Sequence, residues 1–306
     1  MILPPGIHEK KALAALTWFH SGGEARYYCR PREVEEMIES IRWAHKEEIP
    51  IYLLGLGANS LFPDGDLDGL VIHMNRFRCG IDSFQFHAAD LIEVPAGVAL
   101  QNLIADLNRQ GLAGFEHFVG IPGTVGGSVW GNAGAQGHGI GESVEAIQVL
   151  EKTGELHWLT GDVLPWDYRY SGLEDRIVLS VRFRVQPGAD PDFLNQKSRE
   201  FLDYKYSVQP FDQKSTGCIF RNPSEGPSAG QLIEAAGLKG VRCGGAQISE
   251  KHANFIVNPQ KTATTQDVLS LSHLIRETVQ AKAGVLLRQE VVVIGMDNDA
   301  IRSTDE

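Results

Sequence analysis

The chain has 306 residues, of which 42 % are hydrophobic and 22 % are charged, an ordinary balance for a globular protein of two or three domains. Its formal net charge of −11 argues against a nucleic-acid binder, which needs a basic face to neutralise phosphates. No run approaches the roughly 18 apolar residues of a membrane span, and the N-terminus lacks a secretory pattern, so a cytoplasmic location is expected.

The first third of the chain alternates helical and strand patterns. Residues 33–48 are predicted to form an amphipathic helix because apolar side chains recur at helical spacing from Val34 to Ile41. The apolar run 51–54 has strand length and ends in the turn Gly55-Leu56-Gly57-Ala58-Asn59-Ser60. Further elements are expected, in chain order, as strands at 70–72, 84–88 and 91–94 and a helix at 99–109.

Residues 120–141 are dense in glycine and are followed by a second run of regular elements. Strands are predicted at 145–150, 156–159 and 177–185, and a linker at 187–191 ends this α+β part. The remaining elements are expected as helices at 191–204, 228–236 and 265–283, strands at 254–257 and 291–294, and a loop at 209–227. Thr264 and Asp267 resemble a capping box at the start of the last helix.

The turn after the first strand is not a Rossmann fingerprint. Ser60 stands where a third glycine belongs, and a loop and strand follow instead of a helix. A backbone without Cβ can nevertheless bring its N–H groups against a phosphate. The alternative interpretation is a tight turn between two strands.

The segment Gly120-Ile121-Pro122-Gly123-Thr124-Val125-Gly126-Gly127-Ser128 is too rich in glycine for a stable helix interior and too apolar for a disordered linker. It suits a buried loop packed against a large flat ligand, with Asn132 and the backbone supplying hydrogen bonds. The alternative is a packing corner lined by glycine.

The cysteines argue against metal and redox motifs. Cys29, Cys79, Cys218 and Cys243 are widely spaced, and none forms a C-x-x-C pair. This pattern predicts free thiols in a reducing compartment and no metal site.

Several motifs follow one another in a specific order. They are the turn at 55–59, the run 120–127, Asn132-Ala133-Gly134-Ala135, Tyr168-Arg169-Tyr170-Ser171, the run 217–223, the run 229–234, the run 244–255, and Glu290 in the final strand. Over roughly residues 15–295 the chain resembles the UDP-N-acetylenolpyruvoylglucosamine reductases. The ordered set carries this resemblance, since each short piece alone would be weak.

The resemblance implies an α+β fold of the vanillyl-alcohol-oxidase (PCMH) type. It implies FAD-binding subdomains at 1–75 and 76–187 and a C-terminal substrate-binding domain at 188–306. It implies that NADPH reduces FAD and that the flavin then reduces the enolpyruvyl group of UDP-N-acetylglucosamine enolpyruvate to UDP-N-acetylmuramate, for peptidoglycan. The short distance from Tyr168 to Gly217 is similar to the shorter subtype, and His20 is not expected to hold FAD covalently.

Three residues match the catalytic positions that the resemblance implies. Arg169 is the candidate clamp for the substrate carboxylate, because a guanidinium is planar and stays charged. Glu290 is the candidate second charged group, which positions or polarises the enol carboxyl or a water. Cys218 is the candidate proton donor where the family usually carries serine, and a thiol with a free pKa of about 8.5 can keep that role. In isolation they would be a surface ion pair, a solvent-facing strand residue and a small buried hydrophobe.

Two further sets of residues are carried over from the resemblance. Those expected to bind FAD are Gly55, Gly57, Ala58, Asn59, Ser60, Gly120, Ile121, Pro122, Gly123, Thr124, Gly126, Gly127, Asn132 and Gly134. Those expected to meet the substrate or the phosphates of NADPH are Lys205, Arg221, Asn222, Lys239 and Lys251, although a solvated surface cation is the usual role of such residues. Ala58 replaces the more usual serine and Arg221 the more usual lysine.

Two other functions are compatible with parts of this pattern. A flavin oxidase of the same fold would make hydrogen peroxide without NADPH, and the Cys218 loop and the run 244–255 count against it. A non-catalytic nucleotide-binding module would need neither an acid nor a charge stabiliser. The co-occurrence of Arg169, Cys218 and Glu290 favours the reductase, which is expected to act as a monomer.

Overall fold

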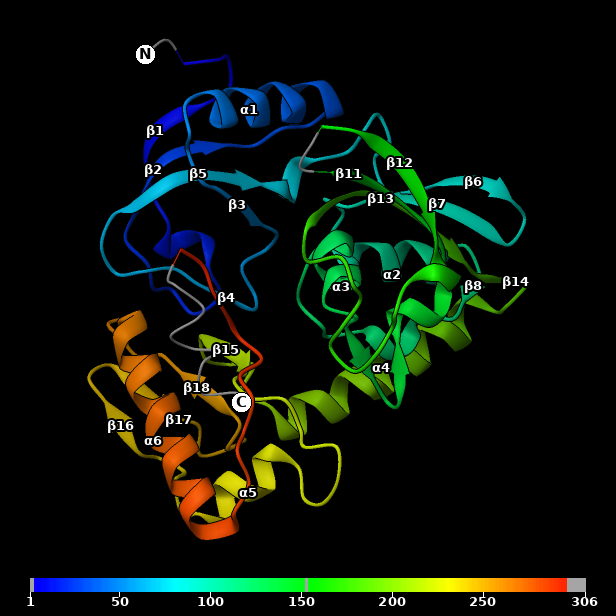
Figure 1. The fold of residues 1–306 in the computed structure, drawn as a ribbon. Helices are drawn as coiled ribbons and strands as arrows, with labels where there is room; N and C mark the ends of the chain where they lie inside the picture. The colour runs from blue at the N-terminus through cyan, green and yellow to red at the C-terminus, as the bar shows by residue number, and fades with distance from the viewer. Residues whose placement is uncertain (1–2, 152–153, 296–306) are drawn as a thin grey trace. The chain divides into compact units, whose positions relative to one another are not determined.

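Figure 1 shows the fold in a computed structural model, which describes residues 3–151 and 154–295. The chain divides into two compact units, each assembled from separate stretches of sequence. The first unit comprises Met1–His8, Tyr28–Leu56 and Leu70–Lys205. The second comprises Glu9–Tyr27, Gly57–Gly69 and Tyr206–Glu306.

The first unit holds most of the regular structure before residue 205. Its helices and 3-10 turns are α1 (Val34–Lys46), η2 (Met74–Arg76), α2 (Leu100–Arg109), η3 (Glu116–Phe118), α3 (Val125–Trp130), η4 (Ile140–Ser143) and η5 (Gly161–Val163). Its strands are β3 (Ile51–Leu54), β6 (Gln85–Ala88), β7 (Leu91–Pro95), β8 (Leu112–Ala113), β9 (Gly134–Ala135), β10 (His138–Gly139), β11 (Val144–Glu151), β12 (Leu156–Thr160), β13 (Arg176–Arg184) and β14 (Gln186–Pro187). Four elements belong partly to each unit, namely β1 (His8–Ala12), β2 (Glu24–Cys29), β5 (Leu67–His73) and α4 (Pro191–Val208).

A five-stranded sheet with the order β12-β11-β13-β7-β6 forms the centre of the first unit. Its neighbours pair antiparallel, and α2 and α3 lie on the same side of it in Figure 1. α3 contacts β13 and β7. α2 buries its apolar stripe at helical spacing, through Leu100, Leu103, Ile104 and Leu107. Burial of this stripe fixes the helix that leads into the glycine-rich segment.

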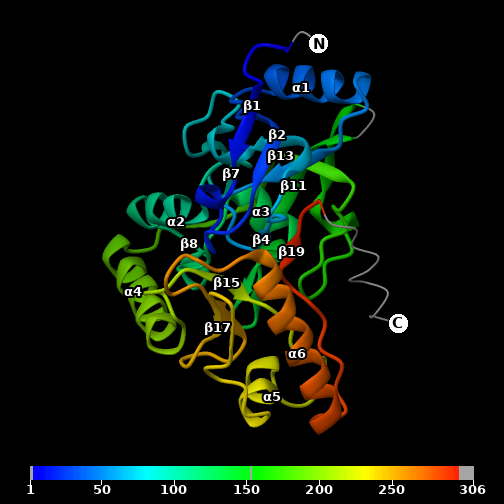
Figure 2. The same ribbon diagram turned by 90° about the vertical axis from the view of Figure 1, so that its left-hand side faces the viewer.

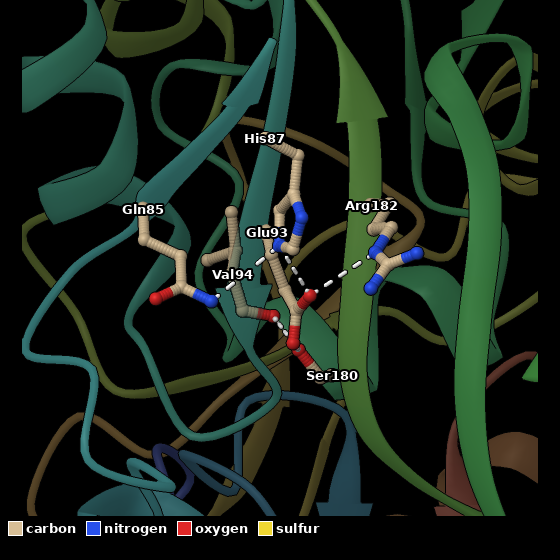
Figure 3. Close-up of polar contacts among 6 residues, drawn as sticks. All are labelled: Gln85, His87, Glu93, Val94, Ser180 and Arg182. Carbon is tan, nitrogen blue, oxygen red and sulfur yellow. Dashed lines mark hydrogen bonds and ion pairs between the residues drawn. The ribbon is translucent and has the colours of Figure 1, made fainter.

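A polar network covers the other face of the same sheet. Glu93 alternates with buried apolar neighbours on β7 and is only 9 % exposed. Its carboxylate accepts hydrogen bonds from Ser180 Oγ (2.9 Å) and Arg182 Nε (3.0 Å) and lies 2.7 Å from His87 Nε2, as Figure 3 shows. The guanidinium of Arg182 also stacks on the Trp158 ring, 4.0 Å from its centroid. These partners compensate the buried carboxylate and join β6, β7, β13 and β12 side chain to side chain.

The second unit contains the C-terminal part of the chain and two earlier segments. Its helices are η1 (Ala14–Leu16), α5 (Ala229–Ala235) and α6 (Thr265–Ala283). Its strands are β4 (Ser60–Leu61), β15 (Ser215–Cys218), β16 (Arg242–Cys243), β17 (Ala246–Ile248), β18 (Phe255–Val257) and β19 (Val292–Val293).

A sheet with the order β15-β18-β17-β16 packs against α6 in the second unit, and Figure 2 shows α6 running beside it. α6 begins with a capping box between Thr264 and Asp267 and ends at Gly284 in the left-handed region. Its buried face consists of Val268, Leu271, Ile275 and Val279. The same core cluster includes Phe19 and Leu61, so the early segments are part of this core.

The early segments also join the C-terminal part by hydrogen bonds. β4 pairs parallel with β19, with Ser60 opposite Val292 and Leu61 opposite Val293. The Thr265 hydroxyl donates to the Phe62 carbonyl at 2.7 Å. The turn that follows β3 therefore completes the second unit. The domain boundaries predicted at 75 and 187 stay a prediction.

Most predicted elements occur within two or three residues of their predicted ends, and α6 spans the predicted 265–283. One exception is the loop predicted at 209–227, where Ser215–Cys218 form β15 because they pair with β18. Another is the glycine-rich segment, where we predicted a loop and the chain forms the short helix α3. The Thr124 hydroxyl accepts a hydrogen bond from the Gly127 N–H and caps this helix. Val125 and Val129 are fully buried, so packing and the cap outweigh the low helix propensity of glycine.

Within residues 3–151 and 154–295, no helix is long and apolar enough to cross a membrane. The four cysteines are free thiols, with Cys29 buried and the other three half-buried. Burial raises the pKa of Cys29 to about 11 and that of Cys79 to about 12.

Candidate active site

Gln101 shapes the start of the glycine-rich segment. This residue lies in the first turn of α2, and its Nε2 donates to the carbonyls of Ile121 (2.7 Å) and Phe118 (3.3 Å). Its Oε1 accepts from the N–H of Gly120 at 2.8 Å. One side chain thus satisfies three backbone groups of a bend in which Gly120 has a φ of 78°.

The end of the segment is held by the turn between β7 and α2. The N–H groups of Val125 and Gly126 donate to the carbonyls of Val98 (2.8 Å) and Ala96 (2.9 Å). A Cβ added to Gly126 would lie 2.7 Å from the Cβ of Ala96. Gly126 is therefore required by close packing of the backbone inside the protein.

Gly123 and Gly127 differ from Gly126 because the space beside them is open. A Cβ on Gly127 would meet only Thr124 Oγ1, at 3.4 Å, and one on Gly123 only Ser128 Oγ, at 3.4 Å. Gly127 is solvent-exposed and has an ordinary helical φ, so the chain itself does not require glycine there. Among the described residues, no acceptor within the chain receives the N–H groups of Gly123 and Thr124. A ligand with acceptor atoms fits this surface.

The first glycine turn lies against this segment. A Cβ on Gly55 would stand 2.9 Å from Thr124 Oγ1, which brings together two of the residues predicted to bind FAD. Gly57, with a φ of 65°, has no room for a Cβ either, because the Leu16 carbonyl oxygen would be 2.3 Å away. Here glycine permits both the bend and the close approach of another chain segment.

Arg169 lies at the tip of a two-residue turn in the first unit. Asp167 and Tyr170 exchange a pair of backbone hydrogen bonds, each 3.1 Å long, across the turn. Arg169 is half-buried with a φ of 57°, and its guanidinium lies 5.1 Å from the centroid of the Tyr168 ring. A Cβ on Gly134 would be 3.3 Å from Arg169 Nη1, so the predicted carboxylate clamp lies directly over a predicted FAD-binding glycine.

Asn132, another predicted FAD-binding residue, is only 9 % exposed. Its Nδ2 donates to the Asp167 carbonyl at 2.8 Å, and its Oδ1 accepts from the Gly141 N–H at 3.1 Å. Both ends of the amide therefore hold backbone groups of the chain. That it also binds the cofactor stays a prediction.

The second unit brings Cys218, Glu290 and the turn at 58–60 together. Cys218 is half-buried and ends β15 after Gly217, which has a φ of 72°. The next residue, Ile219, accepts the N–H of Glu290 through its carbonyl at 2.8 Å. The Asn59 amide donates to the Glu290 carbonyl at 3.1 Å. Sequence reasoning treated these three as separate motifs, and the structure makes them neighbours.

Asn254 is a supporting residue that the sequence analysis did not single out. It is 2 % exposed, and its side chain exchanges two hydrogen bonds with the backbone of Phe220, at 2.8 and 3.0 Å. Its own carbonyl accepts the Ile219 N–H at 2.9 Å. It therefore fixes the backbone directly after Cys218. An asparagine beside the apolar strand β18 was the available signal, since a buried amide needs partners.

Lys205 is the most buried of the predicted phosphate-binding residues. It is 7 % exposed in the last turn of α4, and its Nζ donates to the Val119 carbonyl, immediately before the glycine-rich segment. Burial lowers the pKa of its ammonium from 10.5 to about 8. This cost of burying a charge indicates a role beyond stability.

The other residues predicted to bind the substrate belong to the second unit, where each has its own surroundings. Lys239 pairs with Glu234 at 2.7 Å. Among the described residues, Arg221 Nε is buried without a partner. At the start of α5, the Asn222 side-chain oxygen accepts a hydrogen bond from the Ala229 N–H at 3.0 Å. None of these contacts tests whether the three residues bind a phosphate.

Lys251 borders a cavity of about 490 Å³ in the second unit. The walls include Tyr206, Phe211, Gln247 and Glu250, and Lys251 Nζ donates to the Tyr206 carbonyl at 2.5 Å. The rings of Tyr206 and Phe211 meet edge to face, 4.8 Å between centroids. Two carboxylates, of Asp212 and Glu250, line the cavity together with the Lys251 cation. The aromatic surface and the amide groups suit a polar ring-bearing ligand.

Two family models match consecutive parts of the chain. Residues 25–160 match the family model described as an FAD binding domain, and residues 209–294 match the C-terminal domain of UDP-N-acetylenolpyruvoylglucosamine reductase. A reductase of this name from Gloeobacter violaceus is 38 % identical over 295 residues, covering 96 % of both chains. One from Prochlorococcus marinus is 41 % identical, covering 94 % of both chains.

The chain belongs to the UDP-N-acetylenolpyruvoylglucosamine reductase family.

A solved structure supports the same assignment at the level of the fold. The crystal structure of the UDP-N-acetylenolpyruvylglucosamine reductase from Thermus caldophilus matches with a TM-score of 0.78 and 33 % identity, covering 93 % of this chain and 98 % of that one. The predicted family and the predicted fold, an FAD-binding part followed by a C-terminal domain, are confirmed.

Membership of the reductase family makes the chain an FAD-dependent oxidoreductase with NADPH as the co-substrate. The residues present fit FAD, since Gly123 and Gly127 leave open space, and the N–H groups of Gly123 and Thr124 have no acceptor among the described residues. The structure does not contain the cofactor, so which atoms bind it stays a prediction for each residue.

Proposed function

We propose that this reductase converts UDP-N-acetylglucosamine enolpyruvate to UDP-N-acetylmuramate, a step of peptidoglycan synthesis. The observation that supports it best is the meeting of Cys218, Glu290 and the turn at 58–60 in one unit. FAD, when bound, supplies the hydride that it takes from NADPH. The chain's own residues then have two tasks, which are to hold the enol carboxylate and to deliver one proton.

Arg169 and Glu290 are proposed to act on the negative charge that develops on the substrate, Arg169 by stabilising it and Glu290 by positioning a water or the substrate. Hydride addition to the methylene carbon leaves negative charge on the neighbouring carbon and its carboxylate, and preorganised donors at such a charge contribute about 3–4 kcal/mol each. Arg169 offers two parallel N–H donors to a carboxylate. The backbone of Glu290 is hydrogen-bonded to Ile219 and Asn59. These bonds fix the place from which its carboxyl group would position a water or the substrate.

Cys218 is proposed to give its proton to the carbon next to the carboxylate. The C–H bond forms as the S–H bond breaks, and solvent later returns the proton to the thiolate. Asn254 and Gly217 fix the backbone on either side of the thiol, so its direction is set before substrate binds. A general acid in this position contributes about 10²- to 10⁴-fold to the rate.

The cavity beside Lys251 is proposed to take the nucleotide end of the substrate. Its aromatic pair offers a stacking surface and its amides offer hydrogen bonds to a pyrimidine. Lys251 and Lys239 are the cations of this unit that we assign to the diphosphate, and Lys205 is the cation of the first unit.

An anaerobic half-reaction experiment tests the proposal. The purified holoenzyme is bleached with NADPH and then mixed with UDP-N-acetylglucosamine enolpyruvate, which is expected to restore the yellow colour. Cys218→Ala should be bleached normally and regain colour about 10²- to 10⁴-fold more slowly, whereas Cys218→Ser should retain substantial activity.

Cys243→Ala is the matched control, because Cys243 is a half-buried thiol of the same unit. If Cys218→Ala is reoxidised at the normal rate, the thiol is not the proton donor. If UDP-N-acetylglucosamine enolpyruvate fails to reoxidise the wild-type protein, it is not the substrate of this enzyme.

The proposal includes a monomeric cytoplasmic enzyme with non-covalent FAD. His20 has a φ of 65°, and burial together with Lys214 and Lys261 lowers the pKa of its imidazole. Flavin is expected to stay in the supernatant when the protein is precipitated with acid, and colour retained in the pellet would contradict non-covalent binding.

A further inference from the structure

The turn that carries Arg169 is short and needs outside support. Two backbone hydrogen bonds between Asp167 and Tyr170 close it, and the Tyr168 N–H donates to Asp167 Oδ1 at 2.7 Å. A hairpin of this size is at best marginally stable alone. Arg169 also occupies the left-handed region, with a φ of 57°, which is unfavourable for a residue with a Cβ. Neighbouring groups must therefore hold the guanidinium in place.

Asn132 holds the first residue of the turn. Its Nδ2 donates at 2.8 Å to the same Asp167 carbonyl that closes the turn by accepting the Tyr170 N–H. Its Oδ1 accepts from the Gly141 N–H at 3.1 Å. A carbonyl only accepts and an N–H only donates, so the two partners fix the orientation of the amide.

The amide is enclosed as well as bonded. Asn132 is 9 % exposed and has a φ of 39°, a conformation that asparagine adopts more readily than most residues. A Cβ on Gly139 would lie 2.8 Å from Asn132 Oδ1, so the backbone of that loop packs directly over the amide. Its place cannot shift without moving the loop.

The residue after the turn is held from the same direction. The hydroxyl of Ser171 donates to the carbonyl of Trp130 at 2.6 Å, and Trp130 is the last residue of α3. The two ends of the turn therefore attach to the last residue of α3, Trp130, and to Asn132 just after it. A continuous set of bonds leads from the glycine-rich segment through α3 to the Arg169 turn.

We infer that Asn132 is the positioning residue of Arg169, and this inference rests on the proposed function in that Arg169 is the carboxylate clamp. Asn132 fixes the position and direction of the turn. Gly134, two residues later, leaves the space that the Arg169 guanidinium occupies. The segment Asn132-Ala133-Gly134 thus determines where the substrate carboxylate is held.

The test compares Asn132→Asp with Asn108→Asp in the full holoenzyme. Aspartate keeps the acceptor of Asn132 but loses the donor to Asp167, and places a charged oxygen against a carbonyl oxygen. Asn108 is an equally buried amide of the first unit, 3 % exposed, whose Nδ2 donates to Ser198 Oγ at 2.9 Å, and it lies on α2. The control therefore makes the same chemical change away from the turn.

The first measurement does not depend on activity. Hydrogen exchange of the peptide covering residues 167–171 is expected to become about tenfold faster in Asn132→Asp, as for the loss of one hydrogen bond, and to stay unchanged in Asn108→Asp. Unchanged exchange in Asn132→Asp would overturn the inference, whatever the substrate of the enzyme is.

The second measurement asks whether Asn132 acts through Arg169. When Asn132→Asp has been loaded with FAD and fully reduced, the enolpyruvyl substrate should reoxidise it about 10- to 100-fold more slowly than the wild type. In an Arg169→Ala background the same change should alter reoxidation less than about twofold, because coupled residues are not additive. A full additive loss in that background would overturn the positioning role. No reoxidation of the wild type would instead refute the proposed function and leave the exchange measurement to decide.

Discussion

Replacement of Lys205 by methionine should stabilise the protein at neutral pH and remove a pH dependence. Lys205 is 7 % exposed, and burial lowers the pKa of its ammonium from 10.5 to about 8. A difference of this size corresponds to about 3 kcal/mol, at about 1.4 kcal/mol for each pKa unit. Methionine keeps the apolar stem but leaves the Val119 carbonyl without its donor, which costs about 1–2 kcal/mol. We therefore expect Lys205→Met to be about 1–2 kcal/mol more stable at pH 7.

The sign of the pH dependence follows from proton uptake. Between about pH 8 and pH 10.5 the unfolded chain holds the Lys205 proton while the folded chain has lost it. Stability rises with pH wherever the unfolded state binds more protons, so the wild type gains in this window and Lys205→Met does not. The advantage of the variant should fall by about 3 kcal/mol from pH 7 to pH 10.5 and change sign on the way.

Urea denaturation of the FAD-free protein at pH 7, 8, 9 and 10 measures this difference directly, because other groups titrate equally in both proteins. Lys197→Met, which changes an exposed lysine of the same helix α4, controls for the substitution itself. A stability difference that does not vary with pH would refute the reasoning. The same variant should bind the nucleotide substrate more weakly, since we assign Lys205 to its phosphates.

Three other predictions follow from close contacts and burial. Gly126→Ala should lower the free energy of unfolding by about 1–3 kcal/mol through overpacking, which calorimetry measures. Gly127→Ala should leave the stability of the FAD-free protein unchanged but raise the dissociation constant of FAD, which flavin fluorescence measures. Equal FAD affinities of Gly127→Ala and the wild type would contradict the fit of FAD beside Gly127. Glu93→Ala should cost about 1–3 kcal/mol in urea denaturation because the buried Ser180 hydroxyl and the half-buried Arg182 lose their acceptor, and no loss would mean that the network is not formed in solution. Cys29 and Cys79, whose pKa values burial raises to about 11 and about 12, should resist iodoacetamide at pH 8 in mass spectrometry of the folded protein, and rapid labelling would show that they are open to solvent.

Local signals allowed the helices to be predicted. α6 has a capping box at Thr264, an apolar stripe, and Gly284 at its end, and each of these can be read from neighbouring residues. The glycine-rich segment shows the limit of such signals. Its propensity argues against a helix, but Thr124 caps α3 and the buried Val125 and Val129 stabilise it through contacts with distant strands.

The residues that support the site were harder to find, because their partners are remote in sequence. Gln101 binds the backbone of residues 118–121, Asn132 binds Asp167, and Asn254 binds Phe220. A buried amide indicates that such a partner exists but does not say which one. The family resemblance supplied candidates for the reacting groups but contained no information about these contacts.

The pairing of β4 with β19 has a consequence for synthesis on the ribosome. Ser60 and Leu61 are made about 230 residues before their partners Val292 and Val293. At about 5–20 residues per second, the early strand waits on the order of tens of seconds with its hydrogen-bonding edge uncovered. Residues 70–205 form most of the other unit and can condense during this interval. A nascent chain stalled before residue 290 would therefore leave an open edge and an unfinished core, which are the features that recruit chaperones and proteases.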